Sequence, residues 1–213
     1  MSSLRRTMLA CALAAPIACG LTPTARAVDH PDRFVAWSPD FKDNGVMAMA
    51  TGATGTSVRG PWACGGKDAS PAVSWSHAPK DTKSFAVVMD DLDAASGRGG
   101  THWIAYDIPA NVHALARNAG LHPKAFVGGD IDRKDAAYHG PCAEPGAKMH
   151  HFYFYVYALD VPPGTLPKGL KRADFAKAIQ GHNTAEASFV GRFYHPTDAE
   201  MKKAAGKKQM SQR

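Results

Sequence analysis

Short runs of β-branched and aromatic residues, separated by turn-forming residues, make up most of the chain between residues 28 and 197. The clearest of these apolar runs cover residues 34–38, 72–75, 84–90, 102–108 and 151–160. Valine, isoleucine and aromatic side chains favour β-strands, whereas the Pro, Gly, Asp and Asn residues that bound the runs favour turns. The pattern therefore predicts a mainly β domain.

The run at residues 151–160 differs from the others because neither of its alternating faces is polar. Phe152 and Phe154 belong to one face, and Tyr153 and Tyr155 belong to the other. Since successive strand residues point to opposite faces, both faces of this strand are expected to be covered. We therefore predict that it occupies the middle of a sheet.

Helical periodicity is confined to the last part of the domain. In residues 171–181, Phe175 and Ile179 are four positions apart, and Gly181 stands where a helix would end. The next segment, residues 184–194, alternates with a period of two and predicts another strand. We expect packed β structure with a few short peripheral helices.

The first 27 residues have the three parts of a secretory signal peptide: arginines near the start, a short apolar middle and the small-residue ending Ala-Arg-Ala. Pro16 interrupts the apolar stretch, which is also too short to favour a membrane anchor. We predict cleavage after Ala27, a periplasmic or secreted mature protein, and no transmembrane segment in it. The arginine pair at residues 5–6 leaves twin-arginine export open beside the general secretory route.

Positive charge is concentrated near the end of the chain. The full sequence has a formal net charge of +6, and removal of the predicted signal peptide takes away three arginines and leaves about +3. Residues 198–213 are rich in lysine and have few apolar side chains to pack. We predict a domain at residues 28–197 followed by a solvated, flexible basic tail, and no nucleic-acid partner.

Cysteine usage fits export. Of the four cysteines in the sequence, only Cys64 and Cys142 remain after removal of the signal peptide. Free thiols are poorly protected in an oxidising compartment, so a Cys64–Cys142 disulfide is expected. The alternative is a pair of separate buried thiols.

Common catalytic motifs do not occur in the sequence. No serine stands in a Gly-x-Ser-x-Gly turn, no paired-histidine zinc motif is present, and no glycine loop ends in Gly-Lys-Ser or Gly-Lys-Thr. These observations disfavour the hydrolases and nucleotide-binding enzymes that use those motifs. They leave open an enzyme whose catalytic residues are scattered along the chain.

A cluster of acidic residues follows the apolar run at 84–90. Asp90, Asp91 and Asp93 are expected at a strand end, because unpaired carboxylates do not continue into an apolar core. If the backbone stays extended, Asp91 and Asp93 face one side and Asp90 the other. A glycine-rich connection then returns the chain to His102 at the start of the next strand. These residues form the candidate site.

Three ordered segments, residues 70–94, 101–109 and 138–160, resemble successive motifs of the phosphatidylethanolamine-binding protein family, in its bacterial Raf-kinase-inhibitor-like branch. The ending at residues 181–194 resembles the closing strand of that family. The resemblance covers nearly all of residues 30–195. It implies a fold of two antiparallel sheets and a small cavity that binds an anion.

The resemblance also assigns site residues. The family's Asp-Pro-Asp-Ala-Pro element falls on residues 91–95, which keep both aspartates and lose both prolines, and a family arginine is replaced by His151. Adjacent strand residues face opposite ways, so His150 is expected to point into the site and His151 away from it. The implied ligand-binding residues are Asp91, Asp93, His102, Gly140, Pro141 and His150. The Cys64–Cys142 bond would brace the wall of the cavity.

The leading functional hypothesis is a non-enzymatic binding protein for phosphate or a phospholipid head group, with no metal or other cofactor. Imidazoles donate hydrogen bonds to phosphate, and carboxylates accept them from an ammonium group. A histidine beside a carboxylate holds its proton more firmly, so anion binding should be stronger in mild acid. The alternatives are an Asp/His enzyme, either a metal-dependent or an acid-base hydrolase, and a protein-interaction or inhibitor module.

Overall fold

The structure is a computed structural model that describes residues 32–57, 60–121, 123–124, 126–131 and 138–210. The predicted signal peptide at residues 1–27 lies outside the described residues. Among the helices in the described part of the chain, none is long and apolar enough to cross a membrane.

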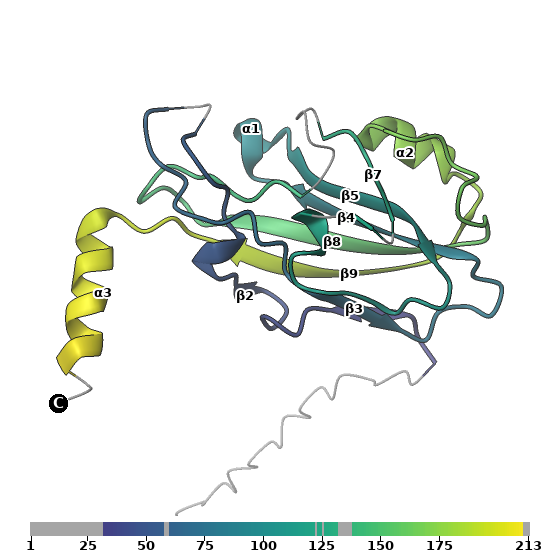
Figure 1. The fold of residues 1–213 in the computed structure, drawn as a ribbon, viewed down its shortest axis with the longest axis horizontal. Coiled ribbons are helices and arrows are strands. Elements are labelled where there is room, and N and C mark those ends of the chain that lie inside the picture. The colour runs from purple at the N-terminus through teal and green to yellow at the C-terminus, as the bar shows by residue number, and fades with distance from the viewer. Residues whose placement is uncertain (1–31, 58–59, 122, 125, 132–137, 211–213) are drawn as a thin grey trace, which may run out of the picture. The chain divides into compact units, whose positions relative to one another are not determined.

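Figure 1 shows the fold of the domain and labels most of its helices and strands. The strands are β1 (Val35–Trp37), β2 (Gly45–Val46), β3 (Val73–Ser76), β4 (Ser84–Asp91), β5 (Gly100–Pro109), β6 (Ala114–Leu115), β7 (Val127–Gly128), β8 (His150–Leu159) and β9 (Asn183–Phe193). The helices are α1 (Ala94–Gly97), α2 (Arg172–Ala178) and α3 (Asp198–Met210), with single 3-10 turns at η1 (Met49–Thr51) and η2 (Ala119–Leu121). Each strand predicted from the sequence forms, and the predicted helix forms as α2.

The strands make two sheets, as expected for a mainly β fold (Figure 1). The large sheet has the order β2-β9-β8-β4-β5-β7, and the small sheet has the order β1-β3-β6. Neighbouring strands run antiparallel, except that β2 pairs with β9 in parallel. β8 lies between β9 and β4, which confirms its predicted place inside a sheet.

Each face of β8 packs into a different hydrophobic core. Phe152 and Phe154 join the core between the two sheets, together with Trp75 of the small sheet. Tyr157, on the opposite face, joins a second core that Phe175 of α2 completes. Burial of an aromatic or large aliphatic side chain contributes about 1.5–3 kcal/mol, so these two cores fix the position of the strand that carries His150.

β4 ends at Asp91, one residue past the apolar run at residues 84–90 that predicts this strand. It includes both Asp90 and Asp91, which are only 9% and 4% exposed. The strand therefore extends one residue beyond the expected end at Asp90, because neither carboxylate is unpaired. Asp90 accepts hydrogen bonds from Thr101 Oγ1 at 2.7 Å and from Arg172 Nε at 2.9 Å, and Asp91 is bound on the other face of the sheet. A buried charge is tolerated when it is hydrogen-bonded.

Residues 198–210, predicted as a flexible tail, form helix α3. Thr197 and Glu200 cap its start: the Thr197 N–H donates to Glu200 Oε2 at 2.8 Å, and the Glu200 N–H donates to Thr197 Oγ1 at 3.3 Å. Alanine, lysine, glutamine and methionine also have high helix propensity. The tail thus has regular structure, although its side chains at residues 201–204 and 207 are exposed.

Candidate functional site

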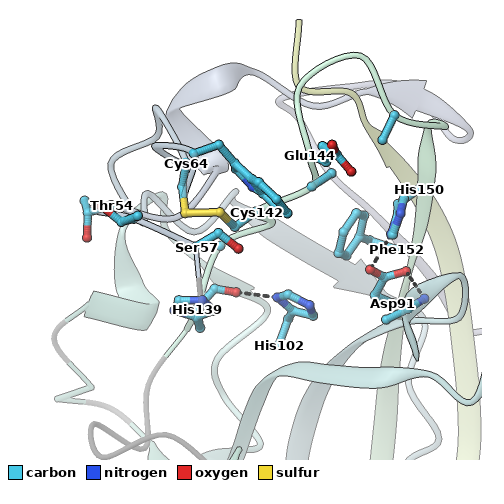
Figure 2. A pocket seen from close by; sticks show the side chains of 16 residues that line it. Thr54, Ser57, Cys64, Asp91, His102, His139, Cys142, Glu144, His150 and Phe152 are labelled. Atoms are coloured by element: carbon cyan, nitrogen blue, oxygen red, sulfur yellow. Dashed lines mark hydrogen bonds and ion pairs between the residues drawn. A yellow bond between two sulfur atoms is a disulfide. The ribbon is translucent and has the colours of Figure 1, made fainter. Parts of the chain in front are cut away.

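A cavity of about 290 Å³ opens at the edge of the large sheet where β4 ends and where β5 and β8 begin (Figure 2). Asp91, His102 and His150 line it from these three strands. The rest of its wall comes mainly from two loops, one that contributes residues 54–57 and 62–64 and one at residues 139–147. The cavity thus contains four of the six predicted ligand-binding residues: Asp91, His102, Gly140 and His150.

The Asp91 carboxylate is hydrogen-bonded through both oxygens. Oδ1 accepts the backbone N–H groups of Asp93 at 2.9 Å and Ala94 at 3.2 Å. Oδ2 lies 2.7 Å from Nδ1 of His150, which donates to it. The side chain of Asp91 is 5% exposed and that of His150 is 23% exposed. Asp91 therefore closes the turn after β4 and orients the His150 imidazole, as Figure 2 shows.

Asp93 does not line the cavity. The expectation that it shares a side with Asp91 required extended backbone, but β4 ends at Asp91 and Asp93 has φ −85° and ψ −13°. Its Oδ2 accepts from the backbone N–H of His151 at 2.7 Å and from His151 Nδ1 at 2.8 Å. The side-chain hydrogen bond from His151 holds the pKa of Asp93 below its usual range. Asp93 and His151 form an exposed pair beside the site.

His102 is the third residue of β5, and its ring is held from two directions. Nδ1 lies 2.7 Å from the carbonyl oxygen of His139, and because a carbonyl only accepts, Nδ1 must donate. The ring meets Phe152 edge-on at a centroid distance of 5.2 Å. Phe152 also contacts the His150 ring at 6.4 Å, so one aromatic side chain supports both imidazoles.

Gly140 and Pro141 hold the two loops together through their backbone. The Gly140 N–H donates to Asp68 Oδ1 at 2.8 Å, and the Pro141 carbonyl accepts from the Ala53 N–H at 2.9 Å. A Cβ at Gly140 would lie 2.3 Å from the carbonyl oxygen of Thr51, so only glycine fits there without displacement. Pro141 does not line the cavity.

Cys64 and Cys142 both line the cavity, one from each loop, and their sulfur atoms lie within bonding distance. Figure 2 shows this link as the yellow bond across the two loops. The pairing agrees with the predicted disulfide and places it in the cavity wall.

Several residues that line the cavity are not predicted as site residues by the sequence. They are the hydroxyl-bearing Thr54, Thr56 and Ser57, the aromatic Trp62, the imidazole of His139 and the carboxylate of Glu144. All six lie in loops, where hydrophobic periodicity gives no information. The feature of the sequence that comes nearest to indicating these loops is the pair of cysteines, since each loop contains one of them.

Comparison with known proteins identifies the family. The model of the phosphatidylethanolamine-binding protein family matches residues 37–194, which include both sheets except the start of β1, and the whole cavity. The chain belongs to this family. The matched residues include the strands that carry Asp91, His102 and His150 and the loops that complete the cavity wall.

Bacterial members of the phosphatidylethanolamine-binding protein family are similar to this chain in sequence and structure. A UPF0098 protein of Aquifex aeolicus is 36% identical over 141 residues, which cover 65% of this chain and 82% of the relative. YbcL of Escherichia coli is 40% identical over 111 residues, 50% of this chain and 61% of YbcL. The crystal structure of YbcL, described as a new member of the mammalian PEBP family, has a TM-score of 0.67 at 29% identity and covers 76% of this chain and 98% of that one. The crystal structure of a protein from Chlamydia trachomatis, described as a putative PEBP homologue, has a TM-score of 0.62 at 26% identity. It covers 76% of this chain and 97% of that one.

Proposed function

We propose that this chain is an exported binding protein that holds phosphate or a phospholipid head group in the cavity and catalyses no reaction. One observation carries the proposal: two imidazoles from different strands line one cavity, and each uses Nδ1 to reach an acceptor in the protein. The acceptor is Asp91 for His150 and the His139 carbonyl for His102. Protonation of either ring then creates an N–H at Nε2, a charge-assisted donor suited to a phosphate oxygen.

The carboxylates of the cavity extend the proposal to a head group that carries both charges. Asp91 is already bound to His150 and to two backbone N–H groups. Glu144 lines the same cavity from the loop at residues 139–147 and supplies an acceptor for an ammonium group. The family's name, which refers to phosphatidylethanolamine, agrees with a ligand that combines a phosphate and an ammonium.

Calorimetric titration of the mature chain with inorganic phosphate and with phosphoethanolamine tests the proposal. A hydrogen bond to a charged group contributes about 1.5–3 kcal/mol, so His150→Gln should weaken binding by at least about tenfold. His182→Gln is the matched control, because His182 Nδ1 donates to Asp160 at 2.8 Å in a similar pair that does not line the cavity. Failure of wild-type protein to bind either probe, or equal binding by wild type and His150→Gln, would overturn the proposal.

The enzymatic alternative has its own test. Elemental analysis of untagged protein and incubation with phosphate esters should give no stoichiometric metal and no product. A stoichiometric metal ion together with turnover that His150→Gln abolishes would replace the binding function with a hydrolase.

Export is tested by the mass of protein recovered from its own cells. The expected mature chain begins at Val28, after removal of residues 1–27. Recovery of the full chain from the cytoplasm would contradict the proposed compartment.

A further inference from the structure

The peptide group between His139 and Gly140 makes a hydrogen bond at each end. Its N–H, on Gly140, donates to Asp68 Oδ1 at 2.8 Å. Its carbonyl, on His139, accepts from His102 Nδ1 at 2.7 Å. Because a peptide group is planar, fixing its N–H end also fixes the direction of its carbonyl. Asp68 and the His102 imidazole are therefore connected through one rigid unit.

Asp68 is itself held firmly. Its Oδ2 accepts from the backbone N–H of Thr54 at 2.9 Å and from Thr54 Oγ1 at 2.7 Å, and Thr54 lines the cavity. Burial of the Asp68 carboxyl disfavours its charge, but the hydrogen bonds from Gly140 and Thr54 outweigh burial and keep the pKa of Asp68 below its usual range. An ionised carboxylate thus bridges the two loops of the cavity wall, beside the Cys64–Cys142 link.

His102 and His139 are also joined by a second bond. The backbone N–H of His139 donates to the backbone carbonyl of His102 at 2.8 Å. The two imidazoles stack with centroids 6.0 Å apart. The backbone at residue 139 therefore cannot turn without disturbing His102.

We propose that Asp68 is a positioning residue that acts on the anion site through this peptide group, in an Asp–peptide–His relay. A carboxylate at the N–H end polarises the peptide and makes the His139 carbonyl a stronger acceptor. The relay holds the His102 proton on Nδ1, so Nε2 is the nitrogen that gains a proton when the ring becomes charged. Asp91 orients His150 by direct contact, whereas Asp68 orients His102 through a peptide group. The expected effect of this relay on anion binding rests on the proposed function.

Asp68→Asn tests the relay. Asn has nearly the same shape and tolerates the positive φ of 51° at residue 68, but it is neutral and cannot accept all three hydrogen bonds unchanged. The matched control is Asp40→Asn: the Asp40 side chain has the same exposure of 16%, accepts from the Ala72 N–H and from Arg117, and does not line the cavity. Both variants should lose stability to denaturant.

Nitrogen NMR of the His102 ring shows which ring nitrogen carries the proton. It therefore distinguishes a specific effect of Asp68 on His102 from a general loss of stability. In wild-type protein the neutral ring should carry its proton on Nδ1, and Asp68→Asn alone should shift the population toward Nε2. Asp68→Asn should also weaken inorganic phosphate binding by roughly three- to tenfold, the scale of one ordinary hydrogen bond, while Asp40→Asn leaves it unchanged.

Three results would overturn the relay: a wild-type His102 protonated on Nε2, an Asp68→Asn ring identical to wild type, or an equal change in Asp40→Asn. The first measurement needs no variant and therefore holds even if Asp68→Asn does not fold. If the NMR results are as expected but wild-type protein binds neither phosphate nor phosphoethanolamine, the relay stands and the proposed anion-binding function fails.

Discussion

Nδ1 of His150 lies 2.7 Å from Oδ2 of Asp91, whose other oxygen accepts two backbone N–H groups of the following turn. One carboxylate thereby ends β4, shapes the turn before α1 and orients an imidazole that lines the cavity. The neighbouring pair, Asp93 and His151, has a similar Nδ1 to oxygen distance of 2.8 Å but lies at the surface, with side chains 46% and 45% exposed. The two pairs differ in burial rather than in chemistry.

Asp91→Asn should impair both folding and binding. An amide has one acceptor oxygen, so it cannot bind His150 and the turn N–H groups as the carboxylate does. We expect a loss of about 1.5–3 kcal/mol in the free energy of unfolding, with about tenfold weaker phosphate binding, measured by urea titration and calorimetry. Asp93→Asn is the control, because an exposed pair contributes only about 0–1 kcal/mol. A larger binding defect in Asp93→Asn than in Asp91→Asn would contradict this assignment.

Anion affinity should fall as pH rises from 5 to 8. Sulfate is the appropriate probe because its charge is constant over this range, whereas phosphate titrates. The cavity contains the imidazoles of His102, His139 and His150 and the carboxylates of Asp91 and Glu144. An imidazole that loses its proton loses the positive charge that attracts an anion, so each one that binds the anion should contribute a drop of up to about tenfold. Calorimetry across the range should show a flatter profile for His150→Gln, and a flat wild-type profile would argue against imidazole donors.

The contribution of Asp68 to stability should disappear in strong acid. Burial opposes its charge, but hydrogen bonds from Gly140 and Thr54 lower its pKa below the usual range of an aspartate. A group whose pKa is lower in the folded state stabilises the fold above its unfolded pKa, and this stabilisation is lost as pH falls through the folded pKa. The difference in unfolding free energy between wild type and Asp68→Asn should therefore be present at pH 6 and shrink toward pH 2. A difference that grows in acid would reverse the sign of this argument.

The link between Cys64 and Cys142 should be present in exported protein and should stabilise the fold. It joins residues 78 positions apart, and a disulfide across a long loop stabilises by about 2–4 kcal/mol. Intact mass with and without reductant should differ by two hydrogens, and the reduced protein should unfold at lower urea. Two free thiols in protein taken from its own compartment would instead support the alternative of separate buried cysteines.

Strands with strong apolar patterns could be predicted from the sequence because their burial is nearly complete. β4 and β8 are both central, and β8 shows apolar residues on each face for that reason. The burial of Asp90 within β4 could not be predicted, because its partner Arg172 is 82 residues away in sequence. Without knowledge of its partner, a carboxylate that follows an apolar run predicts the end of a strand, because an unpaired charge is not expected in the core.

The candidate site likewise contains some residues that could be predicted from the sequence and others that could not. Asp91 and His102 could be selected because they stand near the ends of recognisable strands, whereas His150 was implied by the resemblance to the family. Thr54, Asp68 and other loop residues could not, since their positions are set by contacts between loops rather than by local periodicity. Asp93 would share a side with Asp91 only in extended backbone, and the turn after β4 ends that alternation.

Gly140→Ala should damage the site by overpacking rather than by loss of a chemical group. Its Cβ would lie 2.3 Å from the Thr51 carbonyl and 2.4 Å from the Ala53 nitrogen, and backbone atoms cannot move aside as a flexible side chain can. Overpacking of this kind costs about 1–3 kcal/mol, and the loop must shift in a direction that displaces the peptide group bound to His102. Gly100→Ala is the control, because its nearest contact would be an ordinary 3.5 Å from Ala94. We expect reduced stability and weaker phosphate binding for Gly140→Ala only, and equal effects of the two variants would show that close packing at Gly140 does not maintain the cavity.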